Sequence, residues 1–294
     1  MGKKGFIGLL LLIPIALTSL VSIAYVTLKS QPKDTSIVSA SPTPQVSPTP
    51  TLIPSPSPSP TPTPSPSPKP LSTPAPQSTN STVTSGANYT ILTFDLAATT
   101  VVTDTANDND CANDCPTKPV AQYIAENGGR AGMNGTYFCP ADYASCAGKV
   151  NSFDFAVWNN RHKRWINATT LFWSGRGMMV FRPGSAQFFA CAGCVGAPSD
   201  ITGGIVNYPS LLSGGQVLVS DEGTKGTRSG IGFGGGKLYL VVARNASYFD
   251  LANIFKSLGA QEALNLDGGG SVALYDGGYK VGPGRNLPNT VVIK

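Results

Sequence analysis

The chain has 294 residues, of which 21 are Lys or Arg and 16 are Asp or Glu, giving a formal net charge of +5. After residue 87 the balance is 16 basic against 15 acidic residues, because five lysines and one aspartate precede that point. A nearly neutral domain lacks the concentrated basic face that binds nucleic acid, so we expect no nucleic-acid partner. The single histidine, His162, argues against Ser-His-Asp catalysis and histidine-based metal sites.

The N-terminus predicts a membrane anchor. Between Lys4 and Lys29 lie 24 residues without a charge, enough to span the ~30 Å hydrocarbon core as a helix. We expect residues 1–30 to form a single transmembrane helix. A cleaved signal peptide with small residues at Ser22 and Ala24 is the alternative, and it would make the protein secreted. Either hypothesis places the remainder of the chain outside the cytoplasm.

A proline-rich segment follows. Of the 25 prolines, 15 lie between Ser41 and Pro76, in Ser-Pro and Thr-Pro repeats. Proline fixes φ and lacks an N–H donor, so the segment cannot form a helix or a central strand. We expect residues 31–87 to be a disordered, extended linker that acts as a stalk. A ligand for a proline-binding partner is the alternative function.

Residues 88–294 predict one β-rich α+β domain with two or three helices. Alternation over Tyr89–Asp95 predicts a strand, and 118–126 predicts a short helix begun by Thr117. A second helix is expected over 248–258, with Ser247 as its N-cap and an apolar stripe on one face. Further strands are expected at 153–158, 177–183, 216–220, 237–243, 262–266, 271–276 and 289–294.

Six cysteines fall into three close pairs, which indicates disulfides in an exported domain. Pairing of neighbours is our prediction from spacing alone. A zinc site is one alternative, although the spacings are irregular and no histidine supports it. A redox motif at 191–194 is the other, although it lacks the expected strand-to-helix context. The pairs are Cys111 with Cys115, Cys139 with Cys146, and Cys191 with Cys194.

Residues 230–235 match the dinucleotide-binding pattern GxGxxG in form only. A dinucleotide site needs a helix to begin at the glycines, so that its N–H groups face the pyrophosphate. The following residues, 237–243, instead predict a strand. We therefore expect a glycine-rich hairpin turn and no nucleotide cofactor.

The densest polar cluster is Asn265-Leu266-Asp267 followed by three glycines. In an extended segment Asn265 and Asp267 share one face, while the leucines share the other. The glycines let a ligand approach the backbone closely, and their N–H groups can form an anion-binding concavity. The alternative is an ordinary tight turn whose aspartate accepts local N–H bonds.

Two further segments accompany this cluster, and together they resemble the phosphodiester glycosidase family. The resemblance runs from about residue 131 to the C-terminus, and more loosely from residue 89; the cysteine-bearing segments 139–146 and 191–194 depart from it. The matching stretches are NGTYF (134–138), LLSG (211–214), TRSGIG (227–232), LGA (258–260), ALNLDGGGS (263–271) and NTVV (289–292).

The resemblance implies an α-N-acetylglucosaminidase-like hydrolase that cleaves a sugar from a phosphodiester in an envelope or extracellular glycan. Cleavage of a sugar phosphodiester releases a phosphate as a stable anion that needs little proton donation, so one carboxylate and one cation could suffice. Asp267 is the candidate carboxylate and Arg228 the phosphate clamp. Asp142, Asp154 and Glu262 are candidates for a second carboxylate.

Further candidate residues accompany Asp267 and Arg228. Asn134, grouped with the catalytic residues, and Asn265 could bond sugar hydroxyls or position Asp267. Tyr137 could stack on a sugar face. The expected substrate-binding residues are Asn265, Gly268, Gly269, Gly270, Ser271 and Tyr137. No cofactor is expected, and the sequence leaves a divalent-metal requirement open. A non-catalytic glycan-binding module and a structural envelope protein on a stalk are the rival hypotheses.

Overall fold

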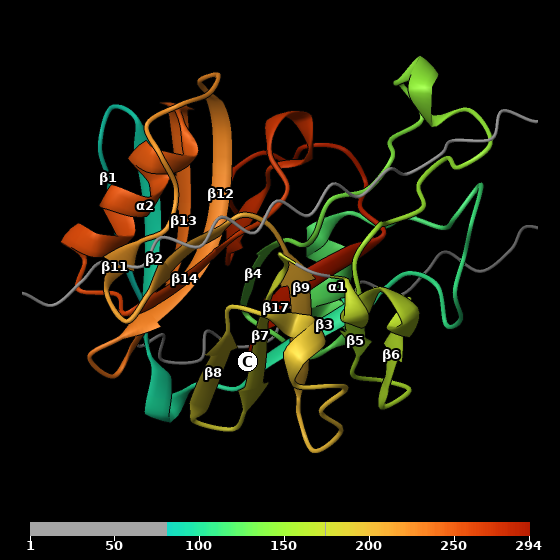
Figure 1. Ribbon diagram of the computed structural model, residues 1–294, viewed down its shortest axis with the longest axis horizontal. Coiled ribbons are helices and arrows are strands. Elements are labelled where there is room, and N and C mark those ends of the chain that lie inside the picture. Colours follow the sequence, from blue (N-terminus) through green and yellow to red (C-terminus); the bar gives the residue numbers. More distant parts are fainter. Residues whose placement is uncertain (1–80, 174) are drawn as a thin grey trace, which may run out of the picture. The chain divides into compact units, whose positions relative to one another are not determined.

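Three antiparallel sheets form the framework of residues 81–173 and 175–294, the part of the chain that the computed structural model describes (Figure 1). The expected anchor, 1–30, and the linker up to residue 80 lie outside the described residues. Neither α-helix of the described part is long and apolar enough to cross a membrane. Two α-helices among many strands confirm the predicted α+β class.

A seven-stranded sheet forms one side of the domain, and α2 (Tyr248–Ser257) packs against it (Figure 1). The helix begins at a capping box, in which Ser247 accepts the Asp250 N–H and Asp250 accepts the Ser247 N–H. Its buried face meets the sheet through Leu251 and Phe255. The strands, in spatial order, are β1 (Ser81–Ser85), β2 (Tyr89–Asp95), β13 (Lys237–Ala246), β12 (Gly226–Gly234), β14 (Glu262–Asn265), β10 (Ser210–Ser213) and β11 (Gln216–Val217).

Two five-stranded sheets complete the fold. The first carries α1 (Val120–Glu126), which packs against β4 and β17. Its strands, in order, are β16 (Tyr279–Val281), β15 (Leu274–Asp276), β4 (Ala131–Asn134), β17 (Asn289–Ile293) and β3 (Val101–Thr105). The second sheet consists of β6 (Arg164–Ile166), β5 (Val157–Asn159), β9 (Gly203–Asn207), β7 (Gly177–Arg182) and β8 (Ser185–Phe189).

One apolar core joins all three sheets. Phe94 of β2, Met133 of β4 and Phe181 of β7 are fully buried in the same cluster. Burial of this kind is the main favourable contribution to folding. The sheets are therefore tied into one body, and the residues at their junctions hold fixed positions.

Several boundaries differ from those expected. The strands expected at 153–158, 216–220 and 271–276 are shorter, at β5, β11 and β15. β1 lies in a segment that the sequence analysis assigns to the linker, and it pairs along its whole length with β2. Its sequence, STVTS, is almost entirely polar and its side chains are mostly exposed, so no apolar alternation marks it. Helix α1 begins at Val120 rather than at residue 118, because Lys118 pairs with Leu287 in an isolated bridge.

The glycine pattern at 230–235 is a hairpin, as predicted. β12 pairs with β13 in antiparallel register, and Gly234 lies opposite Lys237. Gly235 and Gly236 form the two-residue turn, with φ of 56° and 73°. Positive φ at both turn positions is the geometry that matches the twist of the flanking strands and that glycine adopts without strain.

All six cysteines form disulfides between neighbours, which confirms the predicted pairing. The bridges join Cys111 to Cys115, Cys139 to Cys146, and Cys191 to Cys194. No free thiolate remains to bind zinc. Disulfides persist in oxidising compartments, so the described domain is extracytoplasmic in character.

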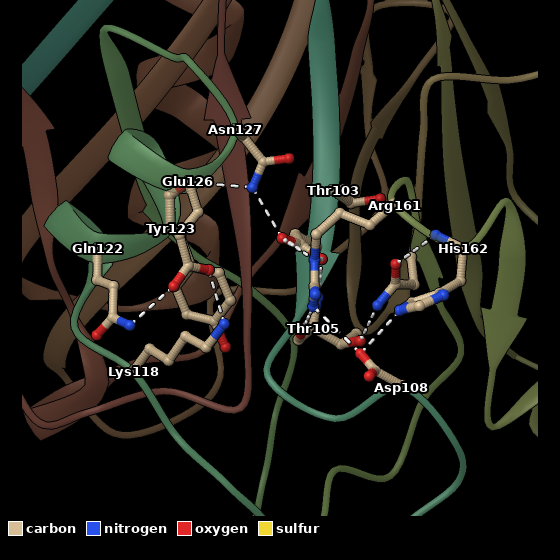
Figure 2. Close-up of polar contacts among 12 residues, drawn as sticks. Thr103, Thr105, Asp108, Lys118, Gln122, Tyr123, Glu126, Asn127, Arg161 and His162 are labelled. Atoms are coloured by element: carbon tan, nitrogen blue, oxygen red, sulfur yellow. Dashed lines mark hydrogen bonds and ion pairs between the residues drawn. The ribbon is translucent and has the colours of Figure 1, made fainter.

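A buried ion pair holds β3 to the β5–β6 hairpin (Figure 2). The Asp104 carboxylate has no solvent exposure and accepts the Arg161 Nε–H, with both oxygens at 3.0 Å. Asn127 at the end of α1 donates to the same carboxylate at 2.8 Å. At the rim, His162 Nε2 lies 2.9 Å from Asp108 Oδ1. His162 thus belongs to a hairpin turn, as expected.

This network predicts a large stability effect at Arg161. We expect Arg161→Ala to lower the free energy of unfolding by about 3 kcal/mol, because it leaves a buried carboxylate without its cation. Arg164→Ala is the matched control, since that exposed arginine donates to Asn109 at the surface, and we expect a change of about 0.5 kcal/mol or less. Urea unfolding of both variants measures the difference; equal midpoints would contradict the assignment.

Candidate active site

The turn that carries Asp267 lies where the seven-stranded sheet meets the sheet of β4. It directly follows β14, and the Leu266 N–H donates to the Ser229 carbonyl of β12 at 2.9 Å. The Asp267 N–H donates to the carbonyl of Gly135, just after β4, at 2.9 Å. Backbone bonds to two different sheets therefore fix the turn.

Asn134 ties this junction together with its side chain. It is fully buried, and its amide nitrogen donates to Ser229 Oγ at 2.9 Å and to the Asp267 carbonyl at 2.8 Å. Its amide oxygen accepts the Ala273 N–H at 3.3 Å. Ser229 Oγ also donates to the Asp267 carbonyl, at 2.7 Å. Both polar atoms of Asn134 thus have protein partners, and through these bonds the side chain holds the Asp267 turn in place.

The Asp267 carboxyl is half-buried and has a raised pKa. Burial raises the pKa from 3.8 to about 6, because loss of solvent disfavours the charged form. The Ser271 hydroxyl, the Gly268 N–H at 2.8 Å and the positive charge of Arg285 each oppose that shift. The group is ionised at neutral pH but close enough to its pKa to respond to small changes in its surroundings.

The glycines after Asp267 pack closely on both sides. A Cβ at position 268 would lie 2.9 Å from the Thr227 carbonyl oxygen of β12. A Cβ at position 270 would lie 2.8 Å from Arg285 Nη2. The run of glycines therefore lets two guanidinium-bearing segments approach the same short loop.

Arg228 lies on the β12 side of this loop, and a Cβ built on Gly268 would be 3.8 Å from its Nη1. Its guanidinium donates to the carbonyls of Ala246 at 3.3 Å and Thr224 at 2.7 Å, and to the Tyr248 hydroxyl at 3.2 Å. The same group stacks over the Tyr248 ring, 4.2 Å from its centroid. These contacts hold the guanidinium plane in one orientation.

Arg285 is a second cation at the loop, and the sequence analysis missed it. Its Nη1 donates to Ser271 Oγ at 3.4 Å and its Nη2 pairs with Asp142 at 2.8 Å. It borders a cavity of about 570 Å³ that also touches Gly270. The available signal was a lone arginine in the Gly/Pro-rich stretch 282–288, just before the last strand.

The candidate second carboxylates do not join Asp267. Asp142 is largely exposed and neutralises Arg285. Glu262 lies at the opposite end of β14, where it accepts the Gly214 N–H at 3.0 Å. Asp154 lines a separate cavity, and its N–H donates to the Tyr137 carbonyl at 3.3 Å. Asp267 is therefore the one candidate carboxylate, among those named from the sequence, that lies on the glycine loop.

Tyr137 and Asn265 form a polar chain that reaches Arg228. Fully buried Asn265 donates to the Tyr137 hydroxyl at 2.7 Å and to the Tyr208 carbonyl at 3.0 Å, and its Oδ1 has no hydrogen-bond partner among the described residues. The Tyr137 and Tyr248 hydroxyls lie 2.9 Å apart. Burial raises the pKa of the Tyr137 phenol, so it stays protonated.

The sequence-predicted residues thus come together from four separate strand ends. Asp267, Arg228, Asn134, Asn265, Tyr137, Ser271 and the three glycines all lie at this junction. A carboxylate on a glycine loop that two guanidinium groups border can stabilise a cationic sugar centre and a departing anion at once.

Comparisons with known proteins bear on the family and the fold of this chain. Residues 127–294 match the sequence model of a family described as phosphodiester glycosidase. A search of curated proteins found no match to the chain. Its fold is similar to a hypothetical protein from Synechocystis, with a TM-score of 0.53 and 14% identity over 72% of this chain and 61% of that one. The chain thus spans less than two thirds of that protein.

The fold is also similar to the catalytic domain of zebrafish N-acetylglucosamine-1-phosphodiester alpha-N-acetylglucosaminidase, auto-inhibited by its pro-peptide. The TM-score is 0.53 at 14% identity, over 70% of this chain and 76% of that one. At such identities these likenesses concern the fold. The sequence model covers more than half of the chain, including Asn134, Arg228 and the whole Asp267 loop, and the chain therefore belongs to the phosphodiester glycosidase family.

Proposed function

We propose that the domain hydrolyses a sugar-1-phosphodiester and releases the free sugar. The observation that carries the proposal is the Asp267 carboxylate on a glycine loop flanked by Arg228 and Arg285. The sugar named for the zebrafish relative, N-acetylglucosamine in α linkage to phosphate, is the first substrate to test.

The roles follow from charge. Cleavage between the anomeric carbon and the phosphate oxygen leaves positive charge on the sugar and returns the electron pair to the phosphate. Ionised Asp267 stabilises or traps the sugar centre until water adds to the anomeric carbon, which frees the carboxylate, releases the sugar and gives up one proton to solvent. Arg228, with its plane fixed by Tyr248, and Arg285, at the edge of the large cavity, stabilise the departing phosphate. A stable phosphate anion leaves without the strong acid that an ordinary glycoside requires.

The other residues at the junction serve these groups. We assign Asn134 to positioning rather than to catalysis, because both of its polar atoms bond inside the protein. Asn265 holds the Tyr137 hydroxyl, and Ser271 hydrogen-bonds the Asp267 carboxylate. The N–H groups of Gly269 and Gly270, on the exposed part of the loop, support the anion.

The setting we propose is extracytoplasmic. Three disulfides fit an oxidising compartment. The uncharged stretch between Lys4 and Lys29 would anchor the chain as a single-pass membrane protein, and the proline-rich segment would hold the domain away from the membrane. The substrate is then a glycan of the envelope or the extracellular space.

Replacement of the carboxylate tests the central role. We expect Asp267→Asn in the full-length protein to lower kcat/KM for an α-N-acetylglucosaminyl phosphodiester by about 10³-fold or more. The native state holds a proton on Asp267 more tightly than the unfolded chain does, so stability is lost as pH rises from about 4 to 6. The variant should therefore unfold at the same or a higher temperature at pH 7.

Asp200→Asn is the matched control, since that carboxyl is exposed on the loop before β9. It should retain full turnover. Equal turnover by Asp267→Asn and the wild type would rule out Asp267 as catalytic. A folded but inactive Asp200→Asn would show that the loss of activity is not specific to the Asp267 carboxylate.

The pH profile tests the electrostatic arrangement. We expect kcat/KM to fall as pH drops through about 6, because Asp267 becomes protonated. Arg285 lowers the pKa of Asp267, so Arg285→Gln should move this acidic limb to higher pH, while Arg285→Lys should keep it near the wild-type position. An acidic limb that stays in place in Arg285→Gln would contradict the proposed coupling.

Leaving-group charge tests the clamp. We expect Arg228→Lys to reduce turnover of sugar phosphodiesters by about 10- to 100-fold, because lysine replaces a stacked, planar fork with a point charge. Aryl glycosides with a neutral leaving group should lose much less. Steady-state kinetics on both substrate classes measure the ratio, and matching losses would refute the role of Arg228.

A further inference from the structure

A second cavity lies away from the Asp267 loop. Its volume is about 330 Å³, and its walls come from 110–112, 152–154 and 167–173. The first of these segments precedes the part of the chain that matches the family model, 127–294. The cavity is therefore built partly by residues outside the family match.

The walls of this cavity are held in place by local bonds. Asp110 accepts the Asn167 N–H at 2.7 Å, and the Asn167 amide donates to the Phe153 carbonyl at 2.6 Å. The disulfide between Cys111 and Cys115 closes the adjoining loop. Such a cavity is formed before any ligand arrives, which lowers the entropic cost of binding.

The polar groups of the lining suit hydroxyl-rich ligands. Ser152 Oγ donates to the Lys149 carbonyl at 2.7 Å, and Thr170 Oγ1 donates to the Asn167 carbonyl at 2.8 Å. A hydroxyl that donates inward keeps its lone pairs for an incoming donor. Exposed Asp154 adds carboxylate acceptors. The lining thus offers acceptors to sugar hydroxyls.

Trp173 supplies an apolar surface beside these acceptors. Its side chain lines the cavity and is 46% exposed, although its ring meets the Phe155 ring edge-on, with centroids 6.0 Å apart. An exposed tryptophan anchored by a buried aromatic ring offers a rigid flat surface at low entropic cost. The C–H face of a pyranose packs on such a surface while its hydroxyls bond the rim.

Aromatic contacts connect this cavity to the active site. The Phe155 ring also meets the ring of Tyr137 at 6.3 Å and that of Tyr208 at 5.7 Å. Tyr208 is 43% exposed, and its carbonyl accepts the amide of Asn265 in the active site. Trp173 and Tyr208 are thus two exposed aromatic residues whose rings both contact the buried Phe155 ring, and Tyr208 also contacts Asn265 of the active site.

We propose that this cavity, with Trp173 and Tyr208, binds further units of an uncharged oligosaccharide whose phosphate-linked sugar occupies the Asp267 site. The inference rests on the proposed function and extends it to the substrate class. Arg176 places one positive charge over the Tyr208 and Phe155 rings, but two carboxylates, Asp110 and Asp154, line the cavity and would repel a polyanionic chain, which favours a neutral one. The cavity would therefore select substrates by the sugar units attached to the one that is cut from the phosphate.

Binding without turnover tests the inference separately from catalysis. In full-length Asp267→Asn protein, we expect an N-acetylglucosamine hexamer to bind at least tenfold more tightly than the monomer, as measured by calorimetry. Trp173→Ala in that background should weaken hexamer binding at least tenfold. Phe172→Ala is the matched control, since Phe172 is 67% exposed but does not line the cavity, and its affinity should stay within twofold.

Charge selectivity provides the second arm. An oligogalacturonate hexamer should bind at least tenfold more weakly than the neutral hexamer. Equal affinity for hexamer and monomer, or an unchanged affinity in Trp173→Ala, would overturn the subsite. Tighter binding of the anionic chain would overturn its assignment to neutral glycans. Length-dependent binding in a wild-type protein that cleaves no phosphodiester would uphold the subsite while refuting the proposed hydrolase.

Discussion

The amide of Asn134 is the contact on which the candidate site depends. With no solvent exposure, it bonds to Ser229 of β12, to the Asp267 carbonyl and to the backbone at Ala273. Asn134 in β4 and Ser229 in β12 belong to different sheets, so this one side chain fixes the position of the Asp267 turn relative to both sheets. Loss of such a bond leaves several buried polar groups unsatisfied at once, which is why the turn and the sheet junction behave as one unit.

The fixed turn explains how a loop that two cations border can carry a carboxylate that forms an ion pair with neither. Arg228 is committed to Tyr248 and to two carbonyls, while Arg285 is neutralised by Asp142. Asp267 keeps a raised pKa because burial outweighs the nearby positive charge. The arrangement therefore keeps its electrostatic capacity for an incoming group whose charge separates as its bond breaks.

Much of the fold follows from local sequence patterns, and the site follows only in part. Strand β2, helix α2 and the Gly235-Gly236 hairpin have alternation, a cap or turn glycines that mark them in the sequence. Strand β1 has no such mark, because its stability comes from backbone pairing with β2. Arg285 reaches the site only because the loop before β17 folds back to Ser271, a long-range effect that no local pattern encodes. The sequence marks Asn134 as a candidate site residue, but its burial depends on the meeting of two sheets.

The three disulfides have a consequence beyond the compartment that they indicate. They join residues only four, seven and three positions apart, so they restrict the unfolded chain less than long-range bridges would. The sheets and their shared core do not run through them. What they shape is the rim: one bridge closes the loop at the smaller cavity, another lies in the segment that contains Asp142, and the third packs its Gly193 against Phe172. Reduction of the disulfides would therefore loosen these rim loops before it unfolded the sheets.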